Sequence, residues 1–151
     1  MGEVNLKQRL SDDLKKAMRS GDITRRNTIR MLMAAINNAE IARQSKLEDS
    51  DIFGVITKEI RQRRESIEAF KKGKRQDLVD KEEAEAAVLQ GYLPQQMTHE
   101  EVVEAARKVI AEVGAAGPGD KGKVMPKLMA QLRGRADGRE VNEVVSELLS
   151  S

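Results

Sequence analysis

The stretch Ile52–Phe70 reads IFGVITKEIRQRRESIEAF and places apolar side chains three, four or seven positions apart, with charged residues between them. This is the period of an amphipathic α-helix, because residues at these spacings lie on one helix face. Acidic residues at 48, 49 and 51 favour a helix start just before it, since carboxylates complement the positive end of the helix dipole. The stretch therefore predicts a long helix that ends near Gly73 and buries Ile52, Val55, Ile56, Ile60, Ile67 and Phe70.

The same helical spacing recurs on both sides of this stretch. Before it, apolar residues recur every fourth position up to Ser20-Gly21, and a second apolar run follows Asp22, a residue type that caps helix N-termini. After it comes a segment at 76–90 rich in Glu and Ala. The predicted buried positions of these three helices are Leu6, Leu10, Leu14 and Met18, then Ile29, Leu32, Met33 and Ile36, then Leu78, Val79, Val88 and Leu89.

A subdomain boundary is predicted at Gly91-Tyr92-Leu93-Pro94, because Gly stops helices and Pro disfavours helix at the residue before it. Three further helices follow, of which the first starts with a capping box at Thr98 and Glu101. No segment alternates apolar and polar residues as a half-buried strand does. We predict an all-α protein with a four-helix N-terminal subdomain, residues 1–93, and a three-helix C-terminal subdomain, residues 94–151. The apolar positions of the three C-terminal helices are Val102, Ala106, Val109, Ile110 and Val113, then Val124, Met125, Leu128, Met129 and Leu132, then Val141, Val144, Val145, Leu148 and Leu149.

Composition excludes several kinds of functional site. The chain has no Cys, no Trp, one Tyr, two Phe and one His, which argues against thiolate metal sites, multi-His metal sites and aromatic stacking platforms for bases. His99 falls inside the capping box and is expected to be an exposed helix residue. We find no catalytic constellation, and we predict no catalytic residue, no metal and no cofactor. Residues 117–123 lack the spacing of a nucleotide-binding phosphate loop, and Val124 stands where that loop needs a hydroxyl.

No stretch approaches the roughly 18 apolar residues that cross a membrane, and the N-terminus has no apolar signal region. We therefore expect a cytoplasmic protein with no membrane partner.

The net charge is only +2, but basic residues gather in two places. Residues 58–75 hold eight basic and three acidic side chains, for which a solvated helix face is the favoured interpretation. Residues 120–139 hold six basic and two acidic side chains around two glycine-bearing turns. Backbone amides at a helix start, with Lys or Arg beside them, suit a phosphate. The glycines equally suit turns that only need left-handed backbone geometry, so both interpretations stay open.

Several segments together resemble the YqeY-like family across nearly the whole chain. They are Arg30–Ile41, Leu47–Asp49, Lys58–Ile67, Tyr92–Pro94, Gly122–Met125, Gly134–Gly138 and Val141-Asn142. Members of that family are similar to the C-terminal helical tail region of the B subunit of the glutamine-dependent aspartyl/glutamyl-tRNA amidotransferase. The resemblance implies two helical subdomains and a connection to tRNA. It also associates the chain with carbon–nitrogen ligases that use glutamine as amide donor, although the chain lacks recognisable elements for that reaction.

The resemblance makes the two C-terminal turns the candidate nucleic-acid-binding site, with Lys127 added on charge alone. We expect a non-catalytic helical module that binds tRNA or structured RNA. Two alternatives stay open: a protein-interaction subunit that docks on a tRNA-metabolism enzyme, which an exposed apolar face on the last helix would favour, and a component of amidotransferase activity. The oligomeric state is not predicted. The candidate residues are Lys121, Gly122, Lys123, Lys127, Gly134, Arg135 and Arg139.

Overall fold

A computed structural model describes residues 5–150, and within that range all the regular elements are helices joined by short connections, with no β-strand. The predicted all-α class is confirmed. The chain divides into two compact units, Met1–Leu93 and Pro94–Ser151, called here the N-terminal and C-terminal units. The N-terminal unit holds α1 (Leu6–Ser20), α2 (Ile23–Arg43), α3 (Asp49–Lys72) and α4 (Gln76–Gln90). The C-terminal unit holds α5 (His99–Val113), a short 3-10 helix η1 (Pro118–Asp120), α6 (Lys121–Leu132) and α7 (Gly138–Ser150).

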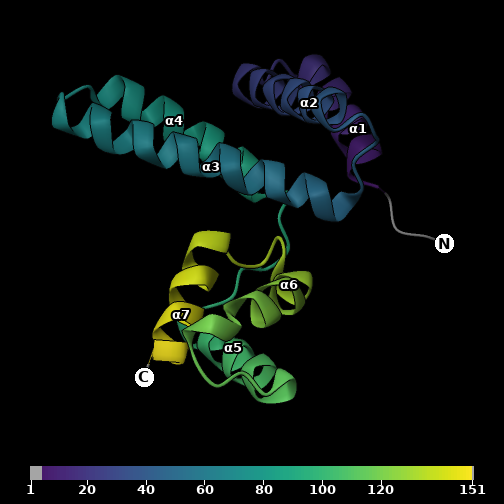
Figure 1. Cartoon of the computed structure of the whole chain (residues 1–151). Coiled ribbons are helices and arrows are strands. Elements are labelled where there is room, and N and C mark those ends of the chain that lie inside the picture. The colour runs from purple at the N-terminus through teal and green to yellow at the C-terminus, as the bar shows by residue number, and fades with distance from the viewer. Residues whose placement is uncertain (1–4, 151) are drawn as a thin grey trace. The chain divides into compact units, whose positions relative to one another are not determined.

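In the N-terminal unit, α3 and α4 form a long antiparallel hairpin, and α1 and α2 pair with each other (Figure 1). Helix α2 also packs on α3 and α4, which closes a core between the two pairs. The fully buried side chains of this core come from α1 to α4, as the apolar spacing requires. They include Leu10, Ile29, Leu32, Ile52, Ile56 and Leu89.

One predicted core residue of α1 lies on the surface. The side chain of Met18 is 53% exposed, and Ala17 is buried in its place. A step of four residues turns an α-helix about 40° past a full circle, so three such steps from Leu6 carry Met18 roughly 120° away from the buried stripe. The buried residue at the end of α1 is therefore Ala17, one position before the residue that the four-residue repeat predicted.

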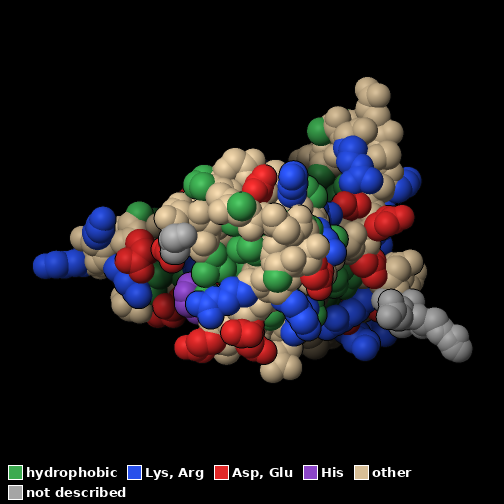
Figure 2. All heavy atoms as spheres, turned by 60° about the horizontal axis from the view of Figure 1, so that its bottom comes forward, with side chains coloured by type: hydrophobic (Ala, Val, Ile, Leu, Met, Phe, Trp, Pro, Cys, Tyr) green, Lys and Arg blue, Asp and Glu red, His purple; other side chains and the backbone are tan. Residues whose placement is uncertain are grey.

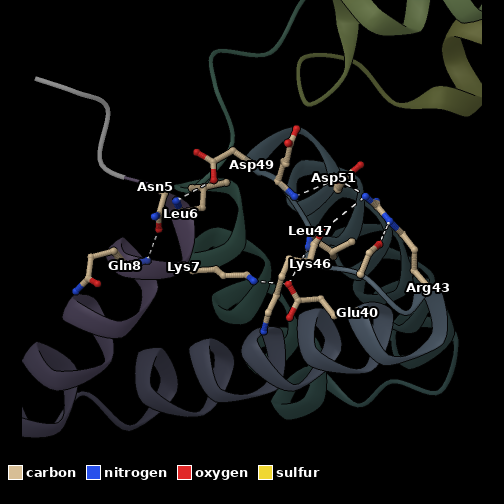
Figure 3. A network of polar contacts seen from close by, with 12 residues as sticks. Asn5, Leu6, Lys7, Gln8, Glu40, Arg43, Lys46, Leu47, Asp49 and Asp51 are labelled. Carbon is tan, nitrogen blue, oxygen red and sulfur yellow. Dashed lines mark hydrogen bonds and ion pairs between the residues drawn. The ribbon is translucent and has the colours of Figure 1, made fainter.

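The start of α1 is tied to the α2–α3 connection by polar contacts (Figure 3). The carboxylate of Glu40 accepts hydrogen bonds from Lys7 Nζ and from the Leu47 backbone N–H, and the Asp49 carboxylate accepts the Leu6 N–H at 3.1 Å. The Lys7 bond and then the Leu47 bond lower the pKa of Glu40 below its ordinary value. Backbone N–H groups in a loop lack the regular hydrogen bonds of a helix, so here carboxylate side chains accept them and hold the loop in place.

A buried ion cluster lies where α3 meets α4. The guanidinium of Arg63, only 5% exposed as a residue, is 2.9 Å from the Glu59 carboxylate and 3.2 Å from the Glu85 carboxylate. The Met31 sulfur of α2 lies 3.8 Å from the same guanidinium. Arg63 belongs to the basic run 58–75. This residue of the run is therefore buried and does not lie on a solvated helix face.

The segment after α4 is fastened to α1. The Tyr92 hydroxyl donates to the Asp13 carboxylate, and the Arg9 guanidinium lies over the Tyr92 ring, 4.6 Å from its centroid. Burial and the Asp13 carboxylate raise the pKa of Tyr92. The chain therefore leaves the N-terminal unit from a fixed point.

The C-terminal unit has its own core, made by one face each of α5, α6 and α7. The predicted capping box is confirmed: the Thr98 hydroxyl accepts the Glu101 N–H at 3.2 Å, and the Glu101 carboxylate accepts the Thr98 N–H at 2.8 Å. His99 opens α5 as an exposed residue, as expected. Pro126 lies in the second turn of α6, and it has no N–H to donate to the Gly122 carbonyl.

Candidate nucleic-acid interface

The first glycine-bearing turn, residues 117–123, carries its own carboxylate. The Asp120 side chain accepts the Ala116 N–H at 2.8 Å and lies 3.6 Å from Lys123 Nζ. The Ala116 bond is the main reason why the pKa of Asp120 is lowered. A phosphate at this turn would therefore meet an acidic side chain, and the exposed Lys123 is the cation of the turn that pairs with it.

The cations of α6 point to different sides of that helix. Lys121 Nζ donates to the Ser146 hydroxyl of α7 at 2.7 Å. Lys127 Nζ lies 2.9 Å from the Glu112 carboxylate of α5 and lowers the pKa of that group. Gly122, between them in sequence, is exposed and has no positive φ. The structure thus does not bring all the predicted α6 residues onto one surface.

The backbone of the second turn, residues 134–139, is used by the fold. Gly134 is buried with φ of 83°, and its carbonyl accepts Gln96 Nε2 at 2.7 Å. The Arg135 N–H donates to the Leu132 carbonyl at 2.8 Å, and the Arg139 N–H donates to the Asp137 carboxylate at 3.1 Å. Of the two interpretations of the turn glycines, the need for left-handed backbone geometry therefore applies at Gly134. A ligand would meet the exposed side chains of Arg135 and Arg139, and the amides of these two residues already have acceptors.

One side chain of this turn joins a groove that the sequence did not predict. Arg135 lines an open groove of about 550 Å³ together with residues of α5 and α6. Three of the lining side chains are cations and one is acidic; Gln131 supplies an amide. The groove, called here the α5–α6 groove, is lined by Met97, Glu104, Ala105, Arg107, Lys108, Gln131, Leu132 and Arg135.

Lys127 extends the same side of α6, because it lies four residues before Gln131 and such residues share a helix face. Its partner Glu112 lies four residues after Lys108 on α5 in the same way. Over the face drawn in Figure 2, basic and acidic side chains are interspersed. An excess of cations over carboxylates within one groove is therefore better evidence for an anion-binding surface than the net charge of the whole unit.

Sequence reasoning missed Arg107 and Lys108. They stand in a segment whose glutamates outnumber its cations, so a count along the chain gives no basic cluster there. The available signal was their position on α5: Ala106 and Val109 on either side are buried, which turns this adjacent pair outward. Only the packing of α5 on α6 places the pair beside Arg135.

The last helix does not present the apolar face that would favour a protein partner. Val141 and Val145 are fully buried, and Leu149 is 5% exposed. All three pack into the core of the C-terminal unit.

Neither a metal centre nor a membrane span is found in residues 5–150. No three His, Asp or Glu side chains of this range gather as metal ligands would. Within the same range, every helix is too short or too polar to cross a bilayer.

Comparison with known proteins identifies relatives. A family model described as Yqey-like protein matches residues 7–149. The chain is 37% identical over 149 residues to "Altered inheritance of mitochondria protein 41, mitochondrial" of Pyrenophora tritici-repentis, which covers 95% of this chain and 80% of that protein. The proteins of the same name from Eremothecium gossypii and Saccharomyces cerevisiae are 45% and 40% identical over 85 and 87 residues. These two matches cover 56% and 57% of this chain and 46% and 47% of the relatives, so each spans about half of the longer protein.

The cytoplasmic location expected from the sequence is contradicted by these relatives, which are named as mitochondrial proteins. The expectation rested on the absence of long apolar stretches and of an apolar signal region at the N-terminus. Neither feature distinguishes the cytoplasm from the inside of an organelle.

Proposed function

The chain belongs to the YqeY-like family, and from that premise we propose that its C-terminal unit binds tRNA or another structured RNA along the phosphate backbone. The observation that carries the proposal is the α5–α6 groove, where Arg107, Lys108 and Arg135 line one depression with a single carboxylate, that of Glu104. Lys127 lies on the same side of α6, where its charge is paired with the Glu112 carboxylate of α5.

The chemistry of the groove suits backbone and shape recognition. Guanidinium groups form paired hydrogen bonds with phosphate oxygens, and a lysine ammonium adds a mobile point charge. The groove has no aromatic side chain on which a base would stack, so sequence readout by stacking has no support. Three phosphate contacts predict that log affinity falls with log salt with a slope of about −2 to −3.

The choice of tRNA within this class rests on the resemblance of the family to the tail region of a tRNA-dependent amidotransferase subunit. The names of the relatives specify no ligand. The proposal concerns binding only, and amide transfer is no part of it.

The test reverses two groove cations, Lys108→Glu and Arg135→Glu, in the full chain. Each charged hydrogen bond contributes about 1.5 kcal/mol or more, so the loss of two weakens tRNA binding about 100-fold. The matched control is Lys58→Glu with Lys81→Glu, which makes the same change in net charge on exposed positions of α3 and α4. Filter binding with radiolabelled tRNA, between about 50 and 200 mM salt, measures both affinity and slope.

Equal weakening by the groove variant and the control would refute the groove as the binding site. A wild-type chain that does not retain tRNA even at low salt would refute RNA binding itself. If the chain instead co-purifies with a tRNA enzyme, and ribonuclease treatment leaves that complex intact, the protein-interaction alternative replaces the proposal.

A further inference from the structure

The N-terminal unit carries a third concentration of basic residues, at the turn between α1 and α2. Between Leu14 and Ala39 there are six basic residues and one acidic residue, Asp22. The excess of basic over acidic residues equals that of residues 58–75. Here, however, none of the basic side chains belongs to a buried ion cluster. The six are Lys15, Lys16, Arg19, Arg25, Arg26 and Arg30.

Four of these cations and two apolar side chains share one surface. On α1, Lys15, Met18 and Arg19 are spaced three and four residues apart and lie on one helix face. On α2, the spacing of Ile23, Arg26 and Arg30 has the same effect. The two faces meet, because the Arg30 guanidinium lies 3.9 Å from the Met18 sulfur. We call these six residues the α1–α2 corner: Lys15, Met18, Arg19, Ile23, Arg26 and Arg30.

The apolar members of the corner are unusually open to solvent for their type. Met18 is 53% exposed and Ile23 is 60% exposed. In the part of the chain that the structure describes, Lys15 and Arg19 have no carboxylate partner. Asp22 does not neutralise the corner, because its carboxylate accepts the Arg25 N–H at 3.0 Å and pairs with the Arg25 guanidinium at 3.5 Å.

We propose that the α1–α2 corner binds the surface of an anionic lipid bilayer. A bilayer interface takes both kinds of side chain at once: methyl and thioether groups enter the acyl boundary while Lys and Arg reach the phosphates of the headgroups. Each cation near such a surface strengthens binding about fivefold, so four of them with two short apolar side chains give weak, reversible attachment.

Other macromolecules fit this surface less well. An RNA backbone pairs with the cations but leaves Met18 and Ile23 in water. A stable protein partner needs a wider apolar centre than two side chains, since specific interfaces bury about 800 Å² on each partner. Charge complementarity and the mixed character of the face therefore favour anionic lipid.

This attachment differs from a membrane span. The sequence-based expectation of no membrane partner rested on the lack of a long apolar stretch, which concerns insertion across the bilayer and not contact with its surface. The proposal is also independent of RNA binding, because it uses other residues in the other unit.

The test is co-sedimentation of the full chain with vesicles of phosphatidylcholine alone, or with about 30 mol% phosphatidylglycerol added. The wild type is expected to sediment only with the anionic vesicles. Arg19→Glu with Arg26→Glu is expected to weaken binding at least 25-fold by the factor of about five per charge. Met18→Ser with Ile23→Ser, at unchanged charge, is expected to weaken it about tenfold. The control Lys58→Glu with Lys81→Glu changes it less than about twofold, and circular dichroism verifies that every variant is folded.

Four outcomes would overturn the proposal. The wild type fails to sediment with anionic vesicles at low salt. The control reversal weakens vesicle binding as much as the corner reversal, so that only net charge matters. The serine variant binds as the wild type does, so that the apolar side chains take no part. If the corner reversal weakens tRNA binding and leaves vesicle binding intact, the corner is an RNA contact instead.

Discussion

Removal of Glu85 tests whether the ion cluster between α3 and α4 is as tightly coupled as its geometry implies. In the folded protein the side chains of Arg63 and Glu85 are 6% and 10% exposed, and that of Glu59 is 17% exposed. Glu85→Ala leaves the buried guanidinium with one carboxylate where it had two. An incompletely paired buried charge is costly because water cannot solvate it.

Breaking a buried ion pair by removing one partner costs about 3–5 kcal/mol. Glu59 stays 2.9 Å from Arg63, so we expect the lower end, about 3 kcal/mol. For a unit of this size that corresponds to a fall in Tm of about 15 °C. The double variant Arg63→Met with Glu85→Leu removes the guanidinium and one carboxylate and refills their volume. The Glu59 carboxylate, which is 17% exposed, then loses its partner, so the double variant is expected to be more stable than Glu85→Ala without fully regaining wild-type stability.

The composition of the chain supplies a selective assay. Tyr92 is the single Tyr and there is no Trp, so tyrosine fluorescence during urea unfolding reports on the N-terminal unit alone. Circular dichroism reports on both units. The reasoning is refuted if Glu85→Ala keeps the wild-type midpoint, or if the double variant is as unstable as the single one.

Two further predictions concern the C-terminal unit. Thr98→Ala removes the hydroxyl that accepts the Glu101 N–H and is expected to destabilise this unit by about 1 kcal/mol; a lowered circular-dichroism midpoint with an unchanged tyrosine transition would verify it, and an unchanged midpoint would contradict it. The pKa values of Glu101 and Asp120 are lowered, chiefly by the Thr98 and Ala116 backbone N–H groups. Because these folded-state pKa values lie below the unfolded ones, the stabilisation is present above about pH 4.5 and is lost as pH falls through the folded values. Urea midpoints measured from pH 7 to pH 3 should therefore fall on acidification, and Glu101→Gln should make the fall shallower.

The sequence was sufficient for the helices because their signals are local. Capping by Asp22 and by Thr98 with Glu101 depends on residues three positions apart, and both caps are present. Apolar periodicity also identified most of the core. It failed at Met18, where a run of four-residue steps drifts around the helix and only packing decides which residue ends up inside.

The candidate site was predicted in part for the same reason. Arg135 was found because a glycine-bearing turn is visible in the chain itself. Arg107 and Lys108 were missed, since they are distant in sequence and stand among glutamates. Their place beside Arg135 follows from the packing of α5 on α6.

By itself, the sequence determined that the chain is helical, where most helices begin and end, and which kinds of chemistry its residue types exclude. Only the tertiary structure decided that Arg63 is buried between two carboxylates, that Lys121 and Lys127 face different helices, and that the α1–α2 corner joins cations to exposed Met18 and Ile23. The physical reason is the range of the interactions. Caps and helical periodicity act within one or two helical turns. The burial of a side chain and the partners of a charged group depend instead on which distant helix packs beside that residue.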